Sequence, residues 1–174
     1  MHLGRIFQTG VIGALLCGLC GCGQKSSPAE KLLDSVAEAN MKLAFASHDY
    51  LETWQDTSTD DPPSDEEAAA RLQGLKDTFA AVQQSVDTLN AAGIEGGEEL
   101  LIAEKEFLTF QGRLLEQQFT QLQELYAKPT IDADKQKEGI NSLVQEIIKA
   151  EEAPAAALME VRRKFATQHK LTVP

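Results

Sequence analysis

The feature that most constrains the fold is a series of apolar residues in residues 72–89, spaced three or four apart. The members of this series are Leu72, Leu75, Phe79, Val82, Val86 and Leu89. This spacing places all six side chains on one face of an α-helix. Three further segments carry similar spacing, and none alternates with period two over several residues. The pattern therefore predicts an all-α fold without strands.

Capping signals set the expected ends of the helices. Ser27 to Glu30 and Ser64 to Glu67 both have the form of a capping box, the first with Pro28 in the first helical position. Gly93, followed by Ile94, suits a left-handed cap after the second helix. Pro129 ends the third. We expect helices over about 28–55, 65–92 and 98–128, and a fourth from about residue 130 to beyond Phe165.

Each helix has an expected core face. In the first, Tyr50 and Trp54 continue the stripe and are interpreted as core. In the third, the stripe shifts by one residue between Leu114 and Leu115. The expected core residues of the first helix are Leu33, Val36, Asn40, Leu43, Ser47, Tyr50 and Trp54; those of the third are Leu100, Ala103, Phe107, Phe110 and Leu114, then Leu115, Phe119, Leu122 and Tyr126; those of the fourth are Ile140, Leu143, Val144, Ile147, Leu158, Val161 and Phe165.

Short connections place successive helices antiparallel, so we expect an up-down four-helix bundle over residues 28–174. Pro154 lies inside the fourth helical pattern, where it removes a backbone donor and clashes one turn back. We therefore expect that helix to be kinked or broken near Pro154. A three-helix bundle with a broken fourth element is the alternative.

The first 22 residues have the pattern of a targeting segment. Residues 1–10 contain Arg5 and no acid, and residues 11–20 are apolar or glycine. The run is too short to cross a bilayer of about 30 Å. It ends in Leu19-Cys20-Gly21-Cys22, and only Cys22 has both glycine directly before it and leucine three residues before it. This ending resembles the lipobox signal peptide of bacterial lipoproteins.

The resemblance implies cleavage at the Leu19-Cys20-Gly21 motif and acylation of Cys22. Residues 1–21 are then a signal peptide, and residues 22–27 a short tether to the helical domain. Cys17 and Cys20 leave with the signal peptide. The mature chain sits in the cell envelope, anchored to membrane lipid. Gly23 favours the outer over the inner membrane if the organism has two.

The net charge of −11 argues against nucleic-acid binding, which requires a basic stripe. The acids concentrate between residues 56 and 67. We interpret this segment as a solvated acidic loop without metal-ligand spacing, at an end of the bundle that is available to a protein partner.

The residues that could ligate a metal do not form a site. His48 and Glu52 are one turn apart but lack two further ligands. Met41 and His169 fall about 15 Å apart in an antiparallel bundle, which excludes haem, so we expect Met41 to fill a core gap. Asp132 begins a calcium-like loop without its later ligands. No Glu-x-x-His and no nucleophile motif is present, so we expect no metal, cofactor or enzyme activity.

One end of the expected bundle lies near the membrane, because only five steps separate Cys22 from Ser27, at most about 17 Å. Lys25, Arg162, Arg163 and Lys164 lie at that end and are candidates for contact with anionic headgroups. Alternatively, the last three only complement a helix C-terminus. The sequence thus favours a non-enzymatic structural or protein-binding envelope lipoprotein. A small-ligand or metal-binding bundle is the alternative.

Overall fold

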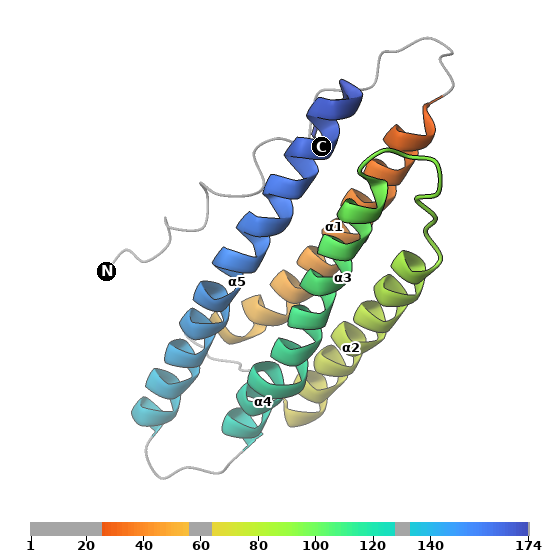
Figure 1. Ribbon diagram of the computed structural model, residues 1–174. Coiled ribbons are helices and arrows are strands. Elements are labelled where there is room, and N and C mark those ends of the chain that lie inside the picture. Colours follow the sequence, from red (N-terminus) through yellow and green to blue (C-terminus); the bar gives the residue numbers. More distant parts are fainter. Residues whose placement is uncertain (1–25, 56–63, 128–132, 174) are drawn as a thin grey trace.

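The computed structural model describes residues 26–55, 64–127 and 133–173, and every regular element in these ranges is a helix (Figure 1). The prediction of an all-α fold is confirmed for this part of the chain. The stretch α3–η1–α4 runs without interruption beside α1, α2 and α5. The elements are α1 (Pro28–Gln55), α2 (Asp65–Asp87), α3 (Gly97–Leu114), the π-helix η1 (Leu115–Phe119), α4 (Thr120–Ala127) and α5 (Ala133–His169).

Both predicted capping boxes are present. At the start of α1, the Ser27 amide donates to Glu30 Oε2 at 3.2 Å, and the Glu30 amide donates to Ser27 Oγ at 3.1 Å. At α2, the Ser64 amide donates to Glu67 Oε2 at 2.8 Å, and the Glu67 amide donates to Ser64 Oγ at 3.2 Å. These reciprocal bonds satisfy amides that a helix start leaves unpaired, so both helices begin where the sequence indicates.

The predicted end of α2 is wrong by about five residues. The helix ends at Asp87, and Thr88 Oγ1 donates to the Ser85 carbonyl at 2.7 Å. Two residues later, Asn90 Oδ1 accepts from the Ala92 amide at 2.9 Å and forms a turn. Gly93 has the positive φ expected of it, 77°, but within the α2–α3 loop rather than at a helix cap.

The larger hydrophobic core cluster extends across all the helices. Tyr50 is 1% exposed, and its ring centroid lies 5.5 Å from that of Phe119. The prediction that Tyr50 belongs to the core is confirmed, whereas the side chain of Trp54 lies outside the described residues. Other buried members are Leu43, Leu72, Leu75, Val82, Leu108, Leu122, Ile140 and Ile147.

A smaller core cluster closes one end of the molecule. It joins the start of α1, the α2–α3 loop, the start of α3 and the end of α5, which Figure 1 shows at the same end. Its buried members are Ala29, Leu32, Leu33, Val36, Ala91, Leu100, Phe165 and Ala166. The tether that we expect before Ser27 therefore joins the body at this end.

The buried face of α3 is rotated from the predicted stripe. Ala103, Phe107 and Phe110 are only partly buried, whereas Glu104 and Gln111 are 0% and 7% exposed. The prediction is confirmed for Leu100 and Leu114, which are buried, and wrong for the middle of the stripe, where Glu104 and Gln111 occupy the buried face and the apolar residues lie at its flank.

The one-residue shift in the stripe at Leu114–Leu115 coincides with η1. A π-helix turn accommodates one extra residue, so side chains beyond it are displaced around the axis. Leu114, Leu115, Phe119 and Leu122 are all buried as a result. The shift in the sequence pattern thus marks a real change in helical winding.

Pro154 does not break the last helix. Helix α5 runs continuously from Ala133 to His169 with Pro154 inside it. The predicted break is therefore wrong, and the predicted kink stays a prediction. The first turn of a helix tolerates proline best, but a helix packed along its length can retain its neighbouring bonds around one missing donor.

Candidate functional site: a buried polar network

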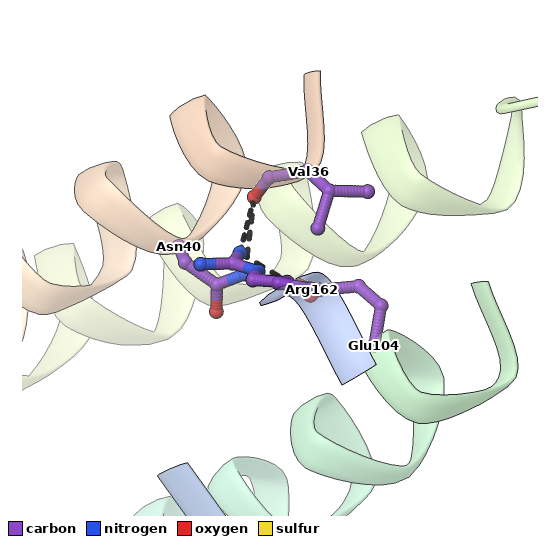
Figure 2. A network of polar contacts seen from close by, with 4 residues as sticks. All are labelled: Val36, Asn40, Glu104 and Arg162. Atoms are coloured by element: carbon purple, nitrogen blue, oxygen red, sulfur yellow. Dashed lines mark hydrogen bonds and ion pairs between the residues drawn. The ribbon is translucent and has the colours of Figure 1, made fainter. Parts of the chain in front are cut away.

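Three polar side chains from three helices meet inside the molecule (Figure 2). Asn40 comes from α1, Glu104 from α3 and Arg162 from α5. The Glu104 side chain is 0% exposed and the Arg162 side chain 9% exposed. This is the most concentrated group of buried polar chemistry in the part of the chain that the structure describes.

The contacts of this network converge on one carboxylate and one carbonyl. Asn40 Nδ2 lies 2.6 and 2.7 Å from the two Glu104 carboxylate oxygens and 3.0 Å from the Val36 carbonyl oxygen. Arg162 Nη2 donates to the same carbonyl at 3.0 Å and lies 3.6 Å from Glu104 Oε2. The network therefore connects α1 to both α3 and α5.

Burial controls the ionisation of the network. It raises the pKa of Glu104, although the hydrogen bond from Asn40 and the charge of Arg162 act in the opposite direction. Burial also lowers the pKa of Arg162, against the influence of Glu104. A guanidinium remains protonated in proteins, so Arg162 is the counter-charge for Glu104.

The geometry suits a structural role better than acid–base chemistry. A general acid or base must reach a substrate, and the Glu104 carboxylate is fully covered. Both of its oxygens already accept from Asn40. Because α1, α3 and α5 each supply one member, sliding any of these helices by one turn would separate the partners.

A second polar contact joins α3 to α5. Gln111 Nε2 donates to Glu151 Oε1 at 2.9 Å, and burial raises the pKa of Glu151. Gln111 also lines a core cavity of about 10 Å³, together with Ser47 and apolar side chains. This volume suits one water molecule at most.

The predicted membrane-contact residues have different environments. Arg162 is buried in the network, so its assignment as a membrane-surface residue is wrong. Arg163 and Lys164 are exposed, and Lys164 Nζ lies 2.9 Å from Glu99 Oε1. Lys25 and the lipobox residues Leu19 to Cys22 lie outside the described residues.

The candidate metal or haem residues that the structure describes do not form a metal site. His48 pairs with Glu52 at 3.0 Å on the surface. His169 Nε2 contacts the Glu95 carbonyl oxygen at 2.8 Å. Met41 is 36% exposed, so the prediction that it fills a core gap is wrong. Within the described residues, no three potential ligands form a group able to hold a metal ion.

The acidic end is described in part. Asp65, Glu66 and Glu67 are exposed at the start of α2, while residues 56–63 lie outside the described part. Burial raises the pKa of Tyr126 on α4, and the negative charges of Asp65 and Glu67 raise it further. The start of α2 and the end of α4 therefore lie at one end of the molecule.

A depression of about 250 Å³, which we call the α2–α3 groove, opens between the α2–α3 loop and the start of α3. Ile102 is 58% exposed there. Lys105, also in its lining, lies with Nζ 2.9 Å from Asp87 Oδ1. The lining residues are Leu89, Asn90, Ala91, Glu98, Leu101, Ile102 and Lys105.

Sequence reasoning missed Glu104 and Gln111. The signal that could have found them is their helical register with Leu100, Leu108 and Leu115, all of which are buried. These five residues follow one another at four, four, three and four positions, the spacing of one helix face. If the buried face of α3 is assigned from helical spacing alone, without regard to hydrophobicity, it includes both Glu104 and Gln111.

No protein-family model, curated protein or solved structure matches this chain. Among the described helices, none has the length and apolar character needed to cross a membrane.

Proposed function

We propose that this chain is a lipid-anchored protein of the bacterial cell envelope whose helical body is a non-enzymatic structural or protein-binding module. The observation that carries the proposal is the Leu19-Cys20-Gly21-Cys22 sequence, followed within a few residues by the capping box of α1. Two acyl chains on Cys22 would give a stable attachment where one chain is marginal. Gly23 favours the outer membrane of a two-membrane organism.

The proposed body is an antiparallel up-down four-helix bundle. Contacts between α3 and α5 support it, because Glu99 meets Lys164 while Gln111 meets Glu151, so residue numbers run in opposite directions. Contacts between α1 and the continuous stretch α3–η1 run in the same direction, as first and third helices of such a bundle require. The pairs are Asn40 with Glu104 and Tyr50 with Phe119.

In this arrangement the acidic end faces away from the tether. The smaller core cluster lies next to Ser27, whereas Asp65, Glu66 and Glu67 lie at the opposite end, beside the end of α4. We therefore assign the acidic end to a protein partner with a basic surface, since complementary charge speeds and orients such encounters.

The test of the anchor is metabolic labelling with a palmitate analogue, followed by membrane fractionation. The full chain is compared with Cys22→Ala and with the matched control Cys20→Ala, two residues away. The full chain and Cys20→Ala should carry label and sediment with membranes, whereas Cys22→Ala should lose both properties. Unchanged labelling of Cys22→Ala would overturn the proposed anchor.

The test of the partner is crosslinking in native membranes. A photo-crosslinking residue at Glu66 should capture a protein that the same residue at the exposed position Lys149 does not capture. Equal capture at both positions would contradict the acidic end as the binding surface. Visible absorbance or bound metal in the purified chain would instead favour the ligand-binding alternative.

A further inference from the structure

The α2–α3 groove combines exposed apolar surface with a location near the tether. Its residues Leu89 and Leu101 pack against the smaller core cluster at the end where α1 begins. The start of α3 also lies close to α1, since a Cβ placed on Gly97 would be 3.2 Å from Leu32 Cδ2. Leu32 is in the first two turns of α1, so the groove flanks the tethered end.

The length of the tether limits how far the groove can lie from the bilayer. With Cys22 acylated at the membrane surface, the five residues to Ser27 span at most about 17 Å. Along the molecule, Ile102 lies only five residues into α3, about 8 Å from its start. The body must therefore remain close enough for one of its flanks to touch the headgroup region.

The lining of the groove carries little net charge, so it suits contact with a neutral surface better than with an anionic one. Its lining contains one acid, Glu98, and one base, Lys105, which is paired with Asp87. This end of the molecule offers fewer free positive charges than the sequence predicts. Arg162 is buried and Lys164 is paired with Glu99, so neither is a free positive charge for anionic headgroups.

Resting on the proposed lipid anchor, we propose that the body leans on the side that carries the α2–α3 groove and that Ile102 inserts into the headgroup region of the bilayer. The exposed Ile102 supplies the apolar tip, and the long stem of Lys105 beside it can lie along the interface with its charge in water. The acidic end then projects away from the membrane.

The experiment measures the depth of three surface positions in the full acylated chain, reconstituted in phosphatidylcholine vesicles. Single cysteines replace Ile102, Thr109 and Phe45, and each carries an environment-sensitive fluorophore. Under the proposed processing no other free thiol remains. Thr109 is the matched control, because it is exposed on the same face of α3, about 10 Å further along. Phe45 is equally exposed but lies on α1.

Lipids with a nitroxide near the headgroup should quench the fluorophore at Ile102→Cys several-fold more strongly than at Thr109→Cys or Phe45→Cys. The effect should be the same with and without phosphatidylglycerol. If the chain binds vesicles but quenching is equal at all three positions, or strongest at Phe45→Cys, the inference is overturned and the anchor stays intact. Quenching that requires phosphatidylglycerol overturns it in favour of a basic contact. A chain with unmodified Cys22 that stays off the vesicles overturns anchor and inference together.

Discussion

Replacing Arg162 by methionine should destabilise the fold strongly, because it removes the counter-charge of a buried carboxylate. Arg162 Nη2 donates to the Val36 carbonyl at 3.0 Å and lies 3.6 Å from Glu104 Oε2. Without it, Glu104 retains only the amide of Asn40. Breaking a buried ion pair from one side typically costs about 3–5 kcal/mol of unfolding free energy, and we expect Arg162→Met to fall in this range at neutral pH.

The size of this loss should depend on pH. Burial already raises the pKa of Glu104 above its ordinary 4.5, and removing the charge of Arg162 raises it further. A carboxyl group with a raised folded-state pKa contributes stability below its unfolded pKa and loses it as pH rises through the folded pKa. As pH rises over that interval, Arg162→Met loses more unfolding free energy than the parent chain does. The difference in stability between the two should therefore be largest at neutral pH and shrink as pH falls towards 4.5.

The measurement is urea unfolding followed by circular dichroism, on chains lacking residues 1–25. Arg163→Met is the matched control, because Arg163 is the exposed neighbour and a surface change is expected to stay within about 0.5 kcal/mol. The double variant Glu104→Leu with Arg162→Met should recover much of the loss, since an apolar replacement of a buried pair is often neutral. An unfolding free energy of Arg162→Met equal to that of Arg163→Met would contradict the role of Arg162 as counter-charge. A loss of stability that is the same at neutral pH and near pH 4.5 would contradict it as well.

Three further predictions use the same unfolding measurement. Gly112→Ala should destabilise the fold by about 1 kcal/mol, because its new Cβ would lie 3.0 Å from Phe79 Cζ. Gly74→Ala, with open space around the new Cβ, should stabilise the fold by about 0.5–1 kcal/mol. Equal effects of the two substitutions would contradict close packing at Gly112. Ser64→Ala removes the cap of α2 and should cost about 1 kcal/mol, and no change would mean that the box is not formed in solution. Glu151→Gln should stabilise at neutral pH, because burial raises the pKa of that carboxyl and disfavours its charge; the gain should vanish below pH 4.5, and a gain that persists there would refute the cause.

The starts of α1 and α2 were predictable because their signals are local. Each capping box lies within four consecutive residues, and its bonds form as soon as the first turn does. The end of α2 was less predictable, since several short polar residues after Asp87 compete for backbone groups before Gly93 is reached. The continuity of α5 through Pro154 depends on packing along its whole length, which no local pattern states.

The register of α3 could have indicated that Glu104 is buried, but its partners could not be predicted, because each member of the network has an ordinary role when read alone. Asn40 resembles a tolerated polar residue in an apolar stripe, Glu104 a solvated helix acid, and Arg162 one of three consecutive bases. Only the juxtaposition of α1, α3 and α5 makes them partners. Charged side chains are almost never buried unless they are paired, so one buried charge implies a partner. This inference requires knowing that the residue is buried, which only the structure shows. The same juxtaposition removes Arg162 from the surface, and the proposed membrane contact is therefore assigned to Ile102 in the α2–α3 groove.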